Sequence, residues 1–384
     1  MFRSIIFWSH LVVGVATGIV VFIMSISGVL LTYERQIVSL VERAFYVEPT
    51  AQMLSLDEIS DRAIEHAGGA ANLSLTFHNN VKAPVTFPLG CEGTVFMSPY
   101  TGDIVGEGGA LKTKAFFGWM TQFHRWLALE GESRTVGKAI ADASNLLFLF
   151  LVVTGIYIWF PKAMNWPAFR MIIFFKSGLP TSKARDFNWH HVLAFWMLIP
   201  IFLMVATAVV FSYGWANEMV YTAYGEEAPV GMGRGGAQVA APRGLAAVTN
   251  TSIDRLSLDQ LMDIAKDYEK DWNTIRMTVP SVTATIVNFA MDSGTGGEPT
   301  KQSTLSLNRG DGSIASISVF TDNSSGQQAR TYIRRLHTGE SHGFIGQTIA
   351  GLGSLAACFL VYTGFALSYR RLIQPLLKKR LARS

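Results

Sequence analysis

The chain has 384 residues, of which 49% are hydrophobic and only 16% are charged. An ordinary soluble domain has about 25% charged residues, so this composition excludes a typical soluble protein and favours a membrane protein. The net charge of +4 is small, and the basic residues lie in short segments beside apolar runs. This distribution is typical of a membrane topology signal and argues against a nucleic-acid-binding surface.

Four apolar segments are long enough to cross a membrane, since a spanning helix needs about 20 apolar residues. They are residues 5–31, 139–160, 191–213 and 344–369. The first segment is too long for the apolar part of a secretory signal, and no small-residue cleavage pattern follows it. We therefore predict an α-helical integral membrane protein with a bundle of four transmembrane helices.

The basic residues predict the orientation of this bundle. Lys and Arg are concentrated in residues 161–188 and in the C-terminal tail, residues 370–384. Short basic segments stay on the cytoplasmic side, so we expect both termini in the cytoplasm. Residues 169–175 are mostly apolar but lie among basic residues, which is typical of either a short helix on the inner membrane surface or an extended linker.

The two long segments between the spans, residues 34–118 and 214–336, are expected on the opposite side of the membrane. Each has the pattern of a small α+β domain, with one helix followed by strands. The expected helices are 55–66 and 257–268, and the expected strands are 73–77, 85–89, 94–97, 104–105, 275–279, 283–291, 304–307 and 313–320. Residues 225–251 are rich in Gly, Ala and Pro and are predicted to form a flexible loop.

The two halves of the chain have the same order of helix, outside domain and helix, which is typical of an internal duplication. Short patterns repeat at matching positions, so the duplication relates His10 to His190 and His124 to His337. The matching patterns are Ser27-Gly28 after His10, Thr207-Ala208 after His190, Thr154-Gly155 after His124, and Thr363-Gly364 after His337.

These four histidines form two layers. At 1.5 Å per residue, His10 and His190 fall near the cytoplasmic end of the bundle, and His124 and His337 fall near its outer end. Ionisable groups at membrane depth are costly, which favours a functional role. Two facing imidazoles fit the axial positions of a haem iron, so the pattern predicts two bis-histidine haems. Interfacial polar residues remain the alternative, and His191 can replace His190 as a ligand.

Several neighbouring residues are candidate surroundings of a haem. Gly14 and Ala194, one turn after His10 and His190, leave space for a flat macrocycle. Three arginines adjoin the outer histidines and either cover haem propionates or anchor the chain at the interface; they are Arg125, Arg334 and Arg335.

Other kinds of site are disfavoured. A zinc site lacks a cluster of Cys or carboxylates, and Cys91 and Cys358 are expected too far apart for a disulfide. No nucleotide-binding motif is visible, so electrons have to come from another molecule.

Two sets of short motifs resemble a known family. Residues 56–59 (LDEI) and 98–104 (SPYTGDI) resemble the PepSY domain, and residues 123–127, 189–191 and 336–340 resemble signature segments of the PepSY-associated transmembrane family. The motifs occur in order over nearly the whole chain. Within that family, the chain is similar to the siderophore reductases of the FoxB type.

This resemblance implies a protein of the bacterial inner membrane that holds two haem b groups and reduces ferric siderophores, such as hydroxamates, in the periplasm. Such an oxidoreductase takes electrons from a quinol or a cytoplasmic reductase and releases Fe(II) for iron uptake. The chain departs from the pattern at Ala194, where the family usually has Gly, and in its second outside domain, which matches PepSY poorly. A non-redox PepSY binding or regulatory module and a siderophore transporter are the alternatives.

Overall fold

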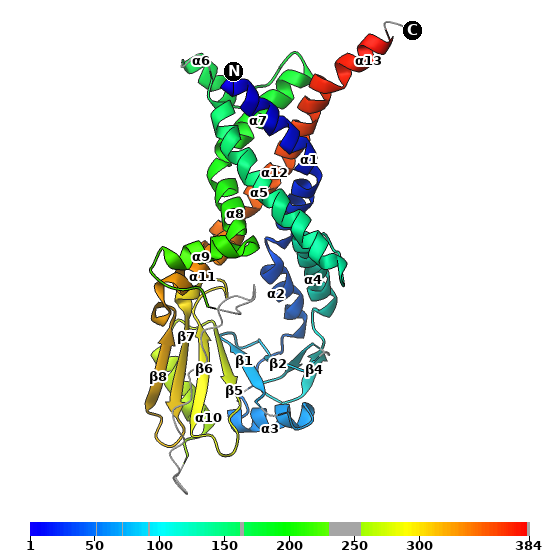
Figure 1. Ribbon diagram of the computed structural model, residues 1–384. Coiled ribbons are helices and arrows are strands. Elements are labelled where there is room, and N and C mark those ends of the chain that lie inside the picture. The colour runs from blue at the N-terminus through cyan, green and yellow to red at the C-terminus, as the bar shows by residue number, and fades with distance from the viewer. Residues whose placement is uncertain (51, 71, 91–92, 162–164, 230–254, 382–384) are drawn as a thin grey trace. The chain divides into compact units, whose positions relative to one another are not determined.

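The computed structural model describes residues 1–50, 52–70, 72–90, 93–161, 165–229 and 255–381 (Figure 1). Two compact units can be distinguished. The membrane unit contains residues 1–34, 116–228 and 333–384, and the sheet unit contains residues 35–115 and 229–332. Cys91 and most of the expected loop 225–251 lie outside the described residues, whereas Cys358 is a buried free thiol.

Three helices of the membrane unit are long and apolar enough to cross a membrane. They are α1 (Phe2–Leu31), α5 (Ser133–Trp159) and α12 (Gly343–Leu372). Large apolar side chains remain exposed along their outer faces, as expected for surfaces in contact with lipid. These helices agree with the expected segments 5–31, 139–160 and 344–369, although α5 begins earlier than expected, at Ser133.

The expected third span, residues 191–213, is not a straight helix that begins at residue 191. It consists of α7 (Ser182–Trp196) and α8 (Leu198–Ser212), which meet at an angle of 68°. Pro200 explains the break, because it has no N–H to donate to the Trp196 carbonyl and its ring crowds that carbonyl. The helix also begins inside the segment 161–188 that was expected to be a cytoplasmic loop.

The spanning helices pack around a common centre. Helix α1 packs against α5 and α12, and the bent pair α7–α8 packs against the same two helices. Glycines allow close contacts: a Cβ atom at Gly18 of α1 would lie 2.6 Å from the Phe365 ring of α12. Helices α1 and α7–α8 therefore occupy opposite corners, as do α5 and α12.

Shorter helices adjoin the spans, and two of them carry the outer histidines. His124 lies on α4 (Leu111–Trp126) and His337 on α11 (Ser325–Thr338), so these residues are not at the ends of the spanning helices as the sequence suggested. Leu127 and Ala128 after α4, and Gly339 after α11, have positive φ angles that turn the chain toward the next span. The remaining short helices are α6 (Trp166–Ile173), α9 (Gly214–Thr222), η5 (Glu340–His342) and α13 (Gln374–Leu381).

The sheet unit contains a single antiparallel sheet in the order β4-β3-β2-β1-β5-β6-β7-β8. Strands β1 and β5 pair at its centre, with Leu75 opposite Met277. The expected two separate outside domains are therefore one compact unit. The helices are α2 (Glu34–Glu42), η1 (Arg43–Phe45), α3 (Leu56–His66), α10 (Leu258–Tyr268), η3 (Pro299–Lys301) and η4 (Phe320–Asp322). The strands are β1 (Ser74–His78), β2 (Val85–Pro88), β3 (Thr94–Met97), β4 (Ile104–Glu107), β5 (Thr274–Thr278), β6 (Ile286–Asp292), β7 (Gln302–Asn308) and β8 (Ile314–Val319).

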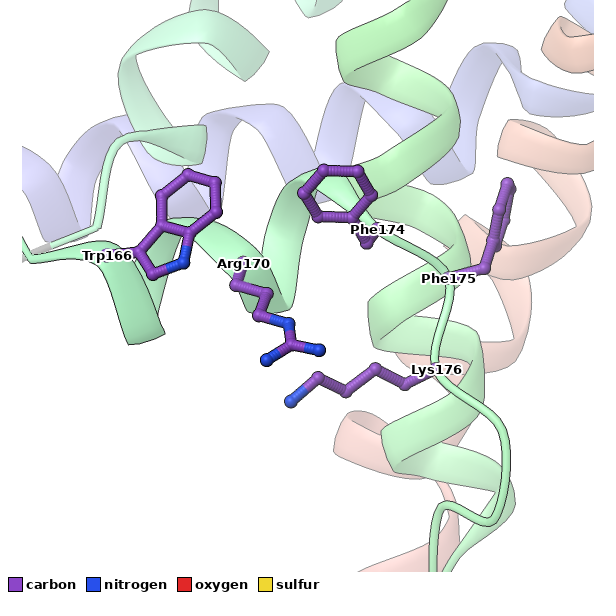
Figure 2. Close-up of a pocket in the computed structure, with 5 residues that line it drawn as sticks. All are labelled: Trp166, Arg170, Phe174, Phe175 and Lys176. Carbon is purple, nitrogen blue, oxygen red and sulfur yellow. The ribbon is translucent and has the colours of Figure 1, made fainter.

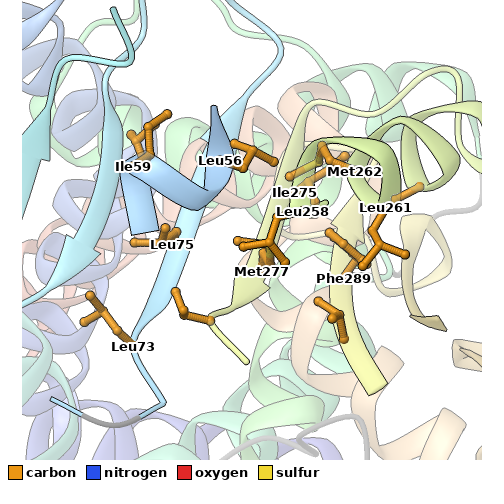
Figure 3. Packing of buried hydrophobic residues seen from close by; sticks show 14 of the residues in the cluster. Leu56, Ile59, Leu73, Leu75, Leu258, Leu261, Met262, Ile275, Met277 and Phe289 are labelled. Carbon is orange, nitrogen blue, oxygen red and sulfur yellow. The ribbon is translucent and has the colours of Figure 1, made fainter. Parts of the chain in front are cut away.

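Helices α3 and α10 stabilise each other across the sheet unit. The Asp57 carboxylate of α3 accepts the backbone N–H of Leu258, and the Asp259 carboxylate of α10 accepts that of Leu56, so each helix caps the other. Buried side chains of both helices and of the central strands form one continuous core (Figure 3). This core extends across the β1–β5 junction, which explains why the two chain segments form one unit.

Candidate functional site: two layers of histidines

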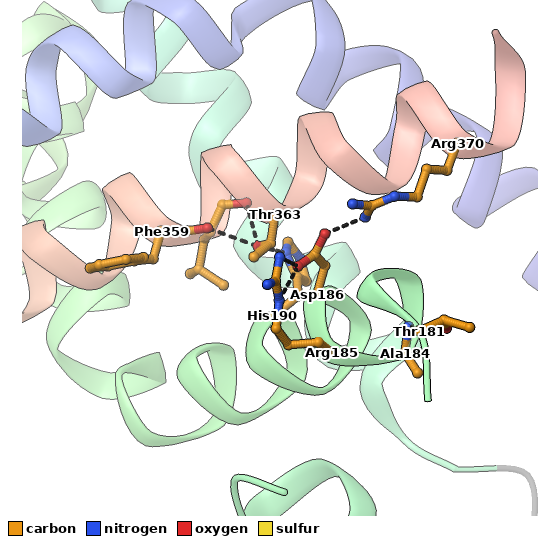
Figure 4. Close-up of polar contacts among 9 residues, drawn as sticks. Thr181, Ala184, Arg185, Asp186, His190, Phe359, Thr363 and Arg370 are labelled. Atoms are coloured by element: carbon orange, nitrogen blue, oxygen red, sulfur yellow. Dashed lines mark hydrogen bonds and ion pairs between the residues drawn. The ribbon is translucent and has the colours of Figure 1, made fainter. Parts of the chain in front are cut away.

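The inner layer consists of His10 on α1 and His190 on α7. The Nδ1 atom of His10 lies 2.9 Å from the Thr154 hydroxyl of α5, and that of His190 lies 2.8 Å from the Thr363 hydroxyl of α12 (Figure 4). The two imidazoles belong to helices at opposite corners of the bundle, and His10 is close enough to interact electrostatically with both His190 and its neighbour His191. The structure thus brings together the inner pair that the sequence suggested.

The outer layer consists of His124 on α4 and His337 on α11. The Nδ1 atom of His124 lies 2.9 Å from the Ser27 hydroxyl of α1. The Nδ1 atom of His337 lies 2.9 Å from the Met204 carbonyl and 3.2 Å from the Thr207 hydroxyl, both on α8. Burial and, to a smaller extent, the nearby His337 lower the pKa of His124 to about 4. Burial also lowers the pKa of His337, so both outer imidazoles stay neutral at pH 7.

The hydroxyl partners determine which ring nitrogen carries the proton. Each hydroxyl donates its only hydrogen to the backbone carbonyl four residues earlier, so it has to accept a hydrogen bond from the histidine. The Nδ1 atom is therefore protonated, and the lone pair is on Nε2. The hydroxyl oxygens and the carbonyl oxygens to which they donate are those of Ser27 and Ile23 (2.6 Å), Thr154 and Phe150 (2.7 Å), Thr207 and Leu203 (2.6 Å), and Thr363 and Phe359 (2.8 Å).

The same tautomer is expected of a histidine that binds a metal through Nε2, because the Nδ1–H group is then oriented by a hydrogen bond. Among the described residues, none of the four Nε2 atoms has a hydrogen-bond partner in the protein. The four hydroxyl-bearing residues were visible in the sequence at repeated positions after the histidines, but each of them bonds to a histidine other than the one that precedes it in the pattern, which the sequence did not indicate.

Small residues follow three of these hydroxyl-bearing residues and lie against the imidazoles. A Cβ atom on Gly155, Gly28 or Gly364 would lie 3.5, 3.6 or 3.7 Å from the Cε1 atom of His10, His124 or His190, respectively. The fourth position is Ala208. Gly14, which the sequence suggested as space for a macrocycle, instead has Leu151 as its nearest neighbour, at 3.9 Å from the Cβ position. Ala194, the other residue suggested for this role, lies on α7 one turn after His190, and its expected role stays a prediction.

His191 has different surroundings from the four layered histidines. Its Nδ1 atom lies 2.8 Å from the Phe187 carbonyl of its own helix, and its ring lies 4.0 Å from the Phe187 ring. Among the residues that the structure describes, no hydroxyl of a neighbouring helix forms a hydrogen bond with the His191 ring. The geometry therefore favours His190 over His191 as the member of the inner layer.

The three arginines near the outer layer have protein partners. Arg335 forms an ion pair of 2.7 Å with Glu340, and the guanidinium of Arg125 lies 4.7 Å from the centre of the Trp126 ring. Arg334 also interacts with other residues of the chain. Their expected role of covering a haem propionate stays a prediction.

A buried ion pair adjoins the inner layer, and the sequence analysis did not identify it. Asp186 is completely buried, lies one helical turn before His190, and pairs with Arg370 of α12 and with Arg185 (Figure 4). The Asp186–Arg370 ion pair connects α7, which carries His190, with α12, which carries its partner Thr363. Thr363 and Arg370 lie on the same face of α12. Removing Arg370 would leave the buried Asp186 carboxylate paired with Arg185 alone, which we expect to be destabilising.

The donor set fits a haem better than a bare metal ion. Within the described ranges, no group of three or more His, Cys, Asp or Glu side chains could hold a metal ion. A haem iron needs only two protein ligands, because the porphyrin supplies the other four. Two neutral imidazoles per layer, each with its Nε2 lone pair available, meet this requirement.

Comparison with known proteins supports the family resemblance. The model of the family described as "PepSY-associated TM region" matches residues 7–371, so the chain belongs to this family. No curated protein matches the sequence.

Proposed function

We propose that this member of the PepSY-associated transmembrane family carries electrons across the bacterial inner membrane through two haem b groups and reduces ferric siderophores in the periplasm. The observation that carries the proposal is the common geometry of the four histidines. Each donates Nδ1–H to a hydroxyl or carbonyl oxygen of a neighbouring helix, which leaves Nε2 as a ligand.

The proposal includes four spans and an internal duplication. If α7 and α8 together form one broken span, the chain has four spans and both termini lie on the cytoplasmic side. The order of a span, a helix with four strands, and a second span then occurs twice. Duplication would account for the equivalent surroundings of His10 and His190, and of His124 and His337.

The residues of each layer have distinct roles in this proposal. His10 and His190 hold the inner haem, and His124 and His337 hold the outer haem. When bound, a haem supplies reversible one-electron chemistry at its iron. The hydroxyls of Ser27, Thr154, Thr207 and Thr363 orient the imidazoles and keep Nε2 deprotonated.

The substrate and the electron donor come from the likeness to siderophore reductases of the FoxB type. The proposed substrate is a ferric hydroxamate. Because hydroxamates bind Fe(II) far more weakly than Fe(III), reduction of the complex releases the iron. The proposed donor is a quinol or a cytoplasmic reductase. The chain would thus act as a haem-dependent oxidoreductase in iron uptake.

A stopped-flow experiment tests this function. Chemically reduced protein is mixed with a ferric hydroxamate siderophore in the presence of a ferrous chelator, and the haem spectrum and the ferrous complex are followed together. We expect reoxidation of the haem with appearance of the ferrous complex, and much slower reoxidation in His124→Ala. Haem that stays reduced while no ferrous complex forms would favour a non-redox binding module.

A further inference from the structure

A cavity of 430 Å³ lies beside α6, in the basic segment between α5 and α7, and it combines aromatic and cationic side chains. Trp166, Phe174 and Phe175 line it together with Arg170 and Lys176 (Figure 2). The three aromatic side chains are exposed to between 46% and 64%. This combination does not belong to either histidine layer and has no role in the proposed electron transfer.

The two cations extend toward the same space. Figure 2 shows the guanidinium of Arg170 and the ammonium of Lys176 pointing toward each other. The one acidic residue between residues 161 and 200 is Asp186, and it pairs with Arg185 and Arg370. In the part of the chain that the structure describes, no carboxylate forms an ion pair with Arg170 or Lys176. Two like charges that face one space favour an anion between them.

The backbone that carries these cations is held by buried hydrogen bonds. The amide of Asn188, a fully buried residue of α7, donates to the carbonyls of Met171 and Phe174 and accepts from the backbone N–H of Lys176. Trp196 of α7 also donates to the Ile173 carbonyl. The segment after α6 is therefore fixed against α7, and the two cations are positioned before any ligand binds.

We propose that this cavity binds the headgroup of an anionic phospholipid, with the phosphate between Arg170 and Lys176 and the acyl chains against Trp166, Phe174 and Phe175. Helix α6 begins shortly after the end of the spanning helix α5 and therefore lies near the membrane surface. An amphiphile can interact with the two cations through its phosphate and with the exposed aromatic side chains through its acyl chains, whereas a free phosphate interacts only with the cations. The inference does not depend on haem binding.

Native mass spectrometry of the full-length protein in detergent, titrated with phosphatidylglycerol, tests the proposal. Arg170→Gln and Lys176→Gln should each weaken binding about fivefold, and the double variant about 25-fold, because each charge contributes separately. Trp166→Ala should weaken binding of the lipid as well. The matched control is Lys183→Gln, which removes one charge from the same basic segment and should leave the affinity unchanged.

Three results would overturn the proposal. Phosphatidylglycerol could bind the double variant as tightly as the unaltered protein, or phosphatidylcholine could bind as tightly as phosphatidylglycerol. Alternatively, inorganic phosphate at the concentration of the lipid could displace it, which would show a site for free phosphate. Circular dichroism of each variant establishes that the side chains, and not the fold, cause any difference.

Discussion

The two histidine layers use the same four corners of the bundle with exchanged roles. In the inner layer, α1 and α7 carry His10 and His190, and α5 and α12 carry their hydroxyl partners. In the outer layer, α1 and α8 carry the partner residues, whereas the histidines lie on α4 and α11, which precede α5 and α12. Each corner therefore supplies a histidine at one level and an oxygen acceptor at the other.

The layers differ in the elements that position their histidines. The inner histidines lie on α1 and on α7, which is half of the bent pair, whereas the outer ones depend on turns between α4 and α5 and between α11 and α12. His337 compensates with two acceptors, the Thr207 hydroxyl and the Met204 carbonyl. The outer layer should therefore respond to changes in the turns, and the inner layer to changes in its single hydroxyl partners.

The largest expected effect is the loss of one haem from one layer. His124→Ala or His337→Ala should remove the outer haem alone, and His10→Ala or His190→Ala the inner haem alone, because an iron with one imidazole loses its bis-histidine coordination. The pyridine haemochrome assay should give half the haem content of the unaltered protein. His191→Ala is the control and should retain both haems. Loss of both haems from a folded single variant would disprove the assignment to layers.

A substitution in a turn should weaken the outer haem and leave the inner haem in place, although no histidine is altered. Gly339 has a φ of +76°, and a Cβ atom there would lie 2.3 Å from the Gly346 carbonyl oxygen. Gly339→Ala should therefore displace α11 and weaken the outer haem, while the inner haem stays in place.

Gly118→Ala on α4 is the matched control, since its Cβ atom would meet nothing within 4 Å. The absorption spectra of both variants, titrated with haem, distinguish the two outcomes. Equal haem binding by Gly339→Ala and Gly118→Ala would show that the turn does not position His337.

Removal of a hydroxyl partner should have a smaller, graded effect. Thr363→Val leaves the Nδ1–H of His190 without its acceptor, which should lower the affinity for the inner haem by about 10- to 100-fold. Thr207→Val should cost less, because His337 still donates to the Met204 carbonyl.

Thr363→Ser is the conservative control and should restore most of the affinity. Competition with apomyoglobin measures each affinity. Equal losses of haem affinity in Thr363→Val and Thr207→Val would contradict the role of the hydroxyls. A haem affinity of Thr363→Ser as low as that of Thr363→Val would contradict it as well.

The smallest effect concerns the pH dependence of the haem-free protein. The pKa of His124 is lowered from 6.5 to about 4, so between these values the unfolded chain binds a proton that the native state does not. The contribution of His124 to stability is therefore complete above pH 6.5 and falls as the pH decreases toward 4. Between pH 7.5 and pH 5.5 it should fall by about 1 kcal/mol.

Thermal melting of the haem-free protein and of His124→Asn at both pH values checks this. The melting temperature of the variant should depend less on pH. An equal pH dependence in the two proteins would contradict the buried, neutral state of His124.

Much of the fold follows from local sequence patterns. The spans at α1, α5 and α12 were predictable because each contains about 20 apolar residues. The bend between α7 and α8 had a local signal in Pro200 that was not used. The joining of β1 to β5 had no such signal, because it depends on contacts between residues that are far apart in the chain, such as Leu75 and Met277.

The site was predictable in part for a similar reason. The layering of His10, His124, His190 and His337 follows from their positions along the chain. Which hydroxyl binds which histidine depends on which helices are neighbours. Residue spacing within one helix does not contain that information. The offset from His10 to Ser27 is an example: Ser27 is the acceptor for His124, not for the histidine on its own helix.

The haem content of the purified protein tests the central claim most directly. The pyridine haemochrome assay, related to protein concentration after expression with an adequate haem supply, should give about two haems per chain. The reduced protein should show the sharp Soret, α and β bands of bis-histidine haem. A folded protein with a haem content near zero would contradict the account, because the four imidazoles would then have a role unrelated to haem.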